Sequence, residues 1–110
     1  MNSSLANHPE PHDHFALEGT IDAQSEAFFK DLPSKVRHPQ VRFDFTRAGR
    51  INSMGIALLL RCFKEIRQVK QAEILLEGLS PMNTMLFKMT GVFLLATPMV
   101  AEDSGKGGSK

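Results

Sequence analysis

The chain contains no tryptophan and no tyrosine, and its single cysteine is Cys62. Tryptophan and tyrosine are the residues most used to stack on bases and to anchor interfaces, so their absence argues against an RNA-binding or sugar-binding module. A lone cysteine cannot form an internal disulfide, and a thiol in an apolar stripe usually behaves as a small hydrophobic group. We therefore expect a reducing, cytoplasmic location.

The sequence also lacks an excess of charge and any long apolar run. Thirteen Lys and Arg nearly balance 12 Asp and Glu, and a formal charge of +1 offers no attraction to nucleic acid or an anionic membrane. No stretch approaches the roughly 20 apolar residues of a membrane span, and the N-terminus does not have the pattern of a signal peptide. With 110 residues and 42% hydrophobic content, the chain is expected to form one small globular domain.

Strand-like and helix-like patterns alternate along this domain. The strand-like segments are residues 14–21, 41–45, 74–76 and 92–96, and the helical segments are residues 23–32, 54–69 and 81–89. This order predicts an α/β fold, with a single small mixed or parallel sheet of about four strands and helices packed on it. We expect a domain over residues 14–97, a flexible lead-in over 1–13 and a disordered tail over 98–110.

The most informative stretch is Asn52, Ser53, Met54 and Gly55, where a predicted strand and loop give way to a helix. The first N–H groups of a helix lack intrahelical partners and the helix dipole favours negative charge, so a phosphoryl group on Ser53 would be tolerated there. Arg47 and Arg50, in the predicted loop over residues 46–51, are candidate phosphate contacts.

Projection of the following helix gives two apolar faces. One stripe is expected to be buried, and it consists of Leu58, Leu59, Cys62, Ile66 and Val69, with Gly55 beneath it and Phe63 at its edge. Ser53 lies in line with Ile56, Ala57, Leu60 and Lys64, which we interpret as a partner-binding face. The alternative is that Ser53 is only an N-cap and that Ile56 and Leu60 lie beneath another element, and the pattern alone does not choose between the two.

Two further groups of residues were considered for binding. The helix over residues 81–89 has more methionines than its inner face can hold, so Met82 and Met85, together with Asp22, are added to the candidate partner surface. His8, His12 and His14 lie close together in a segment that we expect to be flexible, but no cysteine or carboxylate cluster accompanies them. We therefore predict a solvated segment, with no metal and no cofactor.

Three segments together resemble the STAS domain of bacterial anti-sigma-factor antagonists. They are Leu17-Glu18-Gly19-Thr20-Ile21-Asp22, then Ile51-Asn52-Ser53-Met54-Gly55 with its helix, and Leu79-Ser80-Pro81 continuing through Leu86 to Phe93. The resemblance implies that a GHKL-type kinase phosphorylates Ser53, that a PP2C-type phosphatase reverses this, and that only the unphosphorylated form binds an anti-sigma factor or the switch kinase. It implies a transcription regulator that is not an enzyme.

This chain departs from the family pattern at two places. Neutral Asn52 stands where the family usually has Asp, and the chain turns polar after Pro98, where the family has a C-terminal helix. An exposed sheet edge would be consistent with either a monomer or a weak homodimer.

Two rival functions remain. A hydrolase is disfavoured because Ile51 stands where a nucleophile elbow needs glycine and because the histidines fall in tail and connector segments. The other rival keeps the fold but makes the protein a non-switching STAS subunit of a transport complex, or a module that binds a small ligand. Ser53 would then be a helix cap only.

Overall fold

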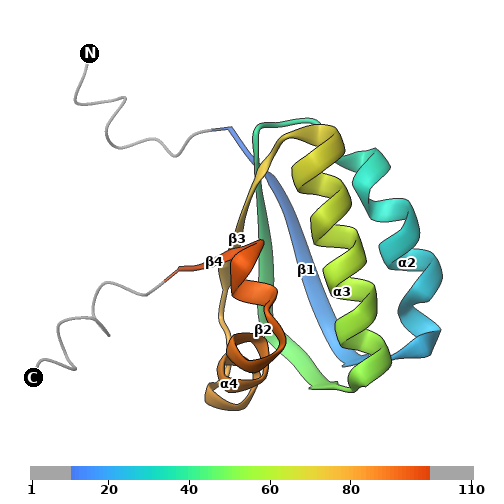
Figure 1. Cartoon of the computed structure of the whole chain (residues 1–110), viewed down its shortest axis with the longest axis vertical. Helices are drawn as coiled ribbons and strands as arrows, with labels where there is room; N and C mark the ends of the chain where they lie inside the picture. Colours follow the sequence, from blue (N-terminus) through green and yellow to red (C-terminus); the bar gives the residue numbers. More distant parts are fainter. Residues whose placement is uncertain (1–10, 100–110) are drawn as a thin grey trace, which may run out of the picture.

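Four parallel strands lie side by side in the order in which they occur in the chain, and helices connect them (Figure 1). The computed structural model describes residues 11–99. The strands are β1 (Asp13–Ile21), β2 (Gln40–Ile51), β3 (Glu73–Glu77) and β4 (Thr97–Pro98), and the α-helices are α2 (Glu26–Asp31), α3 (Ser53–Glu65) and α4 (Pro81–Thr90). Short helical turns complete the fold: η1 (Ala23–Ser25), η2 (Leu32–Lys35), η3 (Ile66–Lys70) and η4 (Val92–Leu94). The predicted α/β fold is confirmed, and the sheet is parallel.

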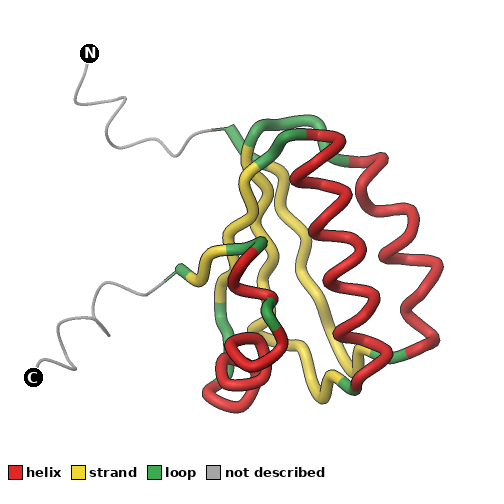
Figure 2. Tube along the Cα trace, in the orientation of Figure 1, coloured by secondary structure: helices red, strands yellow, loops and turns green. Residues whose placement is uncertain are grey.

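The hydrophobic core lies between one face of this sheet and its helices, which form a second layer (Figure 2). Phe43 and Phe45 alternate along β2 and are fully buried. The Phe43 ring packs on Phe63 of α3 with 5.0 Å between ring centroids, and Phe45 packs edge-on against Phe87 of α4 at 5.4 Å. Because residues two apart on a strand share a face, α3 and α4 cover the same side of the sheet.

Residues 46–51 are not the loop that the sequence predicted, because β2 continues through them. The pairing with β1 shifts by one residue twice on the way, so that Glu18 lies opposite Arg47 and Ile21 opposite Ile51. Such bulges insert extra residues into one strand, so the pairing continues although the regular alternation is lost. The period-2 pattern therefore ends at Phe45 while the strand continues.

Residues 92–96 are not a strand either. Gly91 ends α4 with φ +89°, and the chain then turns through η4, where the Leu94 N–H donates to Gly91 and the Ala96 N–H to Val92. The last strand follows as β4, and the Met99 N–H donates to the Leu76 carbonyl at 2.7 Å. Sheet pairing thus extends to residue 99, whereas the rest of the predicted tail, residues 100–110, lies outside the described residues.

At the other end, β1 begins one residue before the expected domain boundary. The Asp13 carboxylate accepts hydrogen bonds from the backbone N–H groups of Arg37 and His38, both at 2.9 Å. These bonds tie the start of β1 to the connection that leads into β2. The remaining lead-in, residues 1–10, lies outside the described residues.

The central helix ends earlier than predicted. Its α-helical part stops at Glu65, a π-helical turn follows as η3, and Gln71 closes the segment with φ +55°. A π turn changes the angular step between residues, so the predicted stripe loses its phase: Ile66 is fully buried but Val69 is 68% exposed. The rest of the stripe is buried as predicted. None of the helices within residues 11–99 is long and apolar enough to cross a membrane.

Candidate functional site

The candidate site lies at the carboxyl edge of the sheet, where β1 and β2 end side by side. Ile21 is paired with Ile51, and the Asn52 N–H donates to the Ile21 carbonyl at 3.3 Å. Asp22 follows Ile21 directly, and its carboxylate accepts a hydrogen bond from the Gln24 N–H at 3.0 Å, which caps η1. The parallel register therefore places Asp22 next to the segment that contains Ser53. A partner surface that includes both residues requires this proximity.

Asn52, and not Ser53, caps α3. The Asn52 Oδ1 accepts a hydrogen bond from the Gly55 N–H at 2.8 Å, and Ser53 is the first residue of the helix. Within residues 11–99, the Ser53 hydroxyl has no hydrogen-bond partner, and Ser53 is exposed. The alternative in which Ser53 serves as the N-cap is therefore wrong, and the hydroxyl is accessible to another protein.

The helix N-terminus around this hydroxyl favours negative charge. The first turn of α3 contains no acidic residue, and Met54 and Gly55, predicted as part of a switch loop, are already helical. The backbone N–H groups of Ser53 and Met54 precede the first intrahelical hydrogen bond, which the Ile56 N–H makes to the Asn52 carbonyl. Within residues 11–99 these two donors have no backbone partner, and together with the positive end of the helix dipole they favour negative charge at this end of α3.

Gly55 fixes the distance between α3 and the end of β1. A methyl group added at Gly55 would collide with the Ile21 carbonyl oxygen and lie 2.9 Å from its carbon. The position therefore requires a residue without Cβ. Because Ser53 precedes Gly55 by two residues in the same turn, this contact also fixes where the hydroxyl stands relative to the sheet.

The expected partner face on α3 is only partly exposed. Ala57 and Lys64 are exposed and Leu60 is half-buried, but Ile56 is 7% exposed and belongs to the core, so its expected exposure is wrong. The helix α3 is flanked on two sides. It packs against α2 on one side, while Leu60 shares a groove with residues of η4 on the other.

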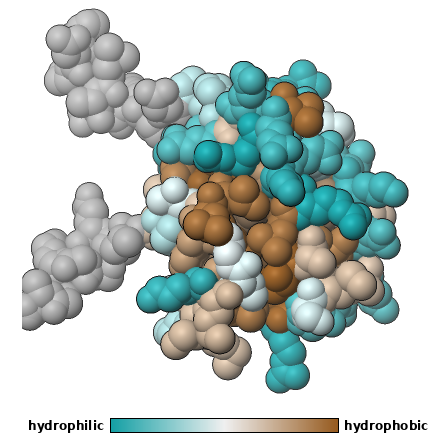
Figure 3. Space-filling model, in the orientation of Figure 1, coloured by the Kyte–Doolittle hydropathy of each residue, from teal (hydrophilic) through white to brown (hydrophobic). Residues whose placement is uncertain are grey.

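This groove has a volume of about 520 Å³ and joins α3 to the end of α4. It is lined by Leu60, Arg61, Lys64, Thr90, Gly91, Leu94 and Leu95. Leu94 is 85% exposed, and apolar side chains gather in the middle of this face of the molecule (Figure 3). Leu94 and Leu95 were not predicted as part of a binding surface because residues 92–96 were expected to form a strand. The available signal was two adjacent leucines shortly after Gly91, the glycine that ends α4.

Met82 and Met85 are exposed, as predicted, but on a different surface. The hollow beside Met85 is lined by Leu79, Pro81, Thr84 and Lys88, which belong to α4 and the segment leading into it, and by no residue of α3. Met89, near the end of the same helix, is also exposed, at 75%. Of this helix only Asn83 and Phe87 are buried, because α4 covers just one end of the sheet.

The two arginines near Ser53 occupy different places. Both belong to β2 and both are exposed. Arg47 is paired with Glu18 on β1, about 16 Å of extended strand before Asn52, whereas Arg50 is separated from Asn52 only by Ile51. Arg50 is the better placed of the two to reach a phosphoryl group on Ser53.

The described histidines lie far from Ser53. His14 is at the start of β1, and the His38 backbone is bonded to Asp13, so both are at the amino end of a strand whose carboxyl end adjoins Ser53. Ile21 is seven positions after His14 on the same strand, which corresponds to about 23 Å. Within residues 11–99 no histidine can therefore act as a base for the Ser53 hydroxyl. Cys62 is no alternative nucleophile, because burial raises the pKa of its thiol to about 12.

The sequence of this four-stranded parallel fold matches a known family. The family model described as STAS domain matches residues 6–102, and the chain belongs to this family. Among curated proteins, it is 30% identical over 97 residues to the anti-sigma-B factor antagonist of Listeria monocytogenes, and the match covers 84% of each chain.

Solved structures agree on the fold. The unphosphorylated anti-sigma factor antagonist SpoIIAA superposes with a TM-score of 0.62 at 19% identity, over 90% of this chain and 88% of that one. The STAS domain of a SulP transporter from Vibrio cholerae superposes with a TM-score of 0.68 at 16% identity, over 87% of this chain and 79% of the other. At such identities the likeness concerns the fold alone.

Proposed function

We propose that this protein is an anti-sigma-factor antagonist that works as a phosphorylation-controlled partner switch, with Ser53 as the phosphoacceptor. One observation carries the proposal: the Ser53 hydroxyl is exposed, has no hydrogen-bond partner among residues 11–99, and lies at a helix N-terminus whose cap Asn52 already provides. A serine needed only for structure would be expected to make the capping bond itself. The named antagonist at 30% identity supports the same conclusion.

In this proposal the unphosphorylated protein binds and sequesters an anti-sigma factor or a GHKL-type switch kinase. The binding surface consists of Asp22, Ser53, Met54, Ala57, Leu60 and Lys64, extended by the groove at Leu94 and Leu95. Ile56 supports this surface from below. A PP2C-type phosphatase restores the binding form, and the protein acts in the cytoplasm as a monomer or a weak homodimer without catalytic activity of its own.

Phosphorylation would act on the interface and not on the fold. A phosphoryl group adds roughly −1.5 to −2 charges at neutral pH. The helix N-terminus accommodates these charges in the free protein, whereas a partner that covers Met54 and Ala57 would have to bury them. Met54 is 49% exposed, so such a partner would desolvate apolar surface directly beside the new charge.

The test is affinity capture with wild type, Ser53→Ala and Ser53→Asp as three baits, with mass spectrometry of the bound proteins and phosphosite mapping of the wild type. The expected result is that Ser53→Ala retains a kinase-like or anti-sigma partner that Ser53→Asp loses. Ser34→Asp is the matched control because Ser34 is also exposed but lies in η2. It should retain the partner.

The outcome that contradicts the switch is recovery of the same proteins by all baits, with no phosphate on Ser53. The protein would then be a constitutive STAS subunit. Recovery of transporter components by all baits would identify it as a subunit of a transport complex.

A further inference from the structure

On the sheet face opposite the core, two carboxylates stand directly across from each other. Asp44 of β2 is paired in register with Glu77 of β3, and both side chains are half-buried. Like charges at directly opposed positions of neighbouring strands are destabilising. This pair therefore favours a positively charged group between them.

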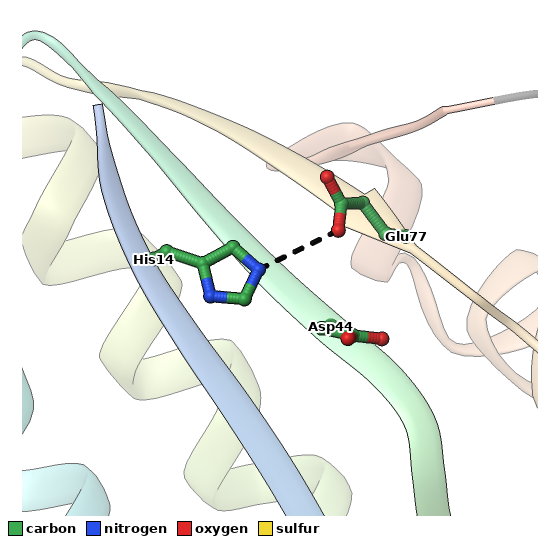
Figure 4. Close-up of side chains that lie close together, drawn as sticks. All are labelled: His14, Asp44 and Glu77. Atoms are coloured by element: carbon green, nitrogen blue, oxygen red, sulfur yellow. Dashed lines mark ion pairs between the residues drawn. The ribbon is translucent and has the colours of Figure 1, made fainter. Parts of the chain in front are cut away.

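His14 of β1 faces the same pair. Its Nε2 lies 3.6 Å from Glu77 Oε1, and one ligand atom each from His14, Asp44 and Glu77 lie within 4.8 Å of one another. Figure 4 shows the three side chains reaching across from three neighbouring strands. A metal site was not predicted because no carboxylates cluster with the histidines along the sequence. Parallel strand pairing brings carboxylates 30 and 63 positions further along the chain next to His14.

The Asp44 carboxylate is held in place by its own strand. Its Oδ1 accepts hydrogen bonds from the Thr46 N–H at 2.9 Å and the Thr46 hydroxyl at 2.6 Å, and these bonds lower the pKa of Asp44. With Oδ1 fixed by Thr46, Oδ2 is left available for a ligand. Hydrogen bonds of this kind orient the carboxylates that ligate metals in proteins. Gly78 leaves space for the hydrogen bonds between Thr46 and Asp44, since a Cβ at position 78 would collide with the Thr46 hydroxyl.

The neighbouring arginines leave the centre of the cluster open. Arg42 approaches the outer oxygen of Glu77, Oε2, at 3.8 Å, and its Nε donates to Gln40 at 3.0 Å. The Glu77 oxygen that faces His14 is the other one, Oε1. Arg47 acts on Asp44 through its charge only. One donor atom of each of the three residues therefore lies within 4.8 Å of the other two, while Arg42 lies beside the other oxygen of Glu77.

We propose that His14, Asp44 and Glu77 form a binding site for a divalent transition-metal ion of the Zn²⁺ type. One imidazole nitrogen and two carboxylate oxygens are a ligand set that such ions accept, with a water molecule as the fourth ligand. Ligands about 2.0–2.2 Å from zinc lie closer together than these donors do, so the exposed His14 and the half-buried Glu77 move towards Asp44 on binding. The ion bridges three adjacent strands and neutralises the opposed carboxylates.

The test is titration of the full chain with Zn²⁺ by isothermal calorimetry, together with NMR of the His14 ring. We expect one binding event that shifts the His14 signals, and a rise in melting temperature with Zn²⁺ concentration because the ion binds the folded state. Asp44→Asn and Glu77→Gln should each weaken binding at least about tenfold, as loss of a ligand or of its support does.

Two controls separate this site from other zinc ligands. Glu73→Gln removes a carboxylate from the same strand and the same face, where Glu73 lies opposite Gln40 and not opposite another acid, and it should bind like the wild type. The double variant His8→Ala/His12→Ala should also keep the site. If Zn²⁺ binding survives Asp44→Asn and Glu77→Gln but disappears in the histidine double variant, the metal binds the N-terminal histidines and the proposal is wrong. Absence of Zn²⁺ binding to the wild type would also overturn it.

Discussion

Replacement of Gly55 by alanine tests how the central helix is seated on the sheet. By helix propensity alone, Gly55→Ala should stabilise the protein by about 1 kcal/mol, because glycine is that much less favourable than alanine within a helix. The structure predicts the opposite sign. The added methyl group would collide with the Ile21 carbonyl oxygen, and backbone atoms cannot rotate away as a side chain would.

The size of the effect follows from the contacts at that position. Inserting a methyl group into a packed site typically costs about 1–3 kcal/mol. Displacing α3 would also weaken the bond from the Asn52 N–H to the Ile21 carbonyl, which is worth about 1 kcal/mol. After subtraction of the gain in propensity, we expect a net loss of about 1–3 kcal/mol in the free energy of unfolding.

Urea unfolding followed by circular dichroism measures this difference. Ala57→Gly is the matched control, because Ala57 is exposed, lies two residues further along the same helix, and should lose about 1 kcal/mol from propensity alone. If Gly55→Ala were as stable as the wild type or more so, the close contact between α3 and β1 would not exist as described, and the position of Ser53 derived from it would be wrong.

Three further predictions concern the same helix and its surroundings. Asn52→Ala removes the cap and should lose about 1 kcal/mol of stability, whereas Asn52→Asp should keep the cap and gain roughly 0.3–1 kcal/mol from the helix dipole. In thermal unfolding, the melting temperature of Asn52→Ala should therefore lie below that of the wild type and that of Asn52→Asp above it. Burial raises the pKa of the Cys62 thiol to about 12 from an ordinary value of 9.0. Its contribution to the free energy of unfolding is therefore complete below about pH 9 and decreases as the pH rises towards about 12. Between about pH 8 and pH 10, urea unfolding should show a steeper decline in this free energy for the wild type than for Cys62→Val. Phe87→Ala should cost about 3–5 kcal/mol, because Phe87 is fully buried against Phe45 and Phe93; a loss below 1 kcal/mol would mean that α4 does not pack on the sheet as described.

Local sequence signals located most of the elements. The alternation of Val41, Phe43 and Phe45, and the Ser80-Pro81 pair before α4, gave a strand and a helix start that the structure confirms. These signals are reliable because they depend on residues next to one another in the chain: a buried face repeats with the period of its element, and a cap bonds to a backbone group three residues away.

The features that sequence did not predict depend on contacts between distant segments. The bulged end of β2 exists because residues 46–51 pair with β1, and the periodicity of β2 alone does not contain that information. Ile56 has the helical spacing of a surface position, and only the packing of α3 into the rest of the domain buries it. The cluster of His14, Asp44 and Glu77 likewise exists only through the register of three strands.

The fold by itself does not distinguish a switch from a constitutive subunit, since an antagonist and a transporter domain superpose on this chain about equally well. The distinction depends on the local chemistry of one turn. Asn52 provides the cap, Gly55 fixes the turn against β1, and the Ser53 hydroxyl makes no hydrogen bond to the part of the chain that the structure describes. Modifying a group that contributes nothing to folding can change binding without changing stability, and this separation is what a reversible switch requires.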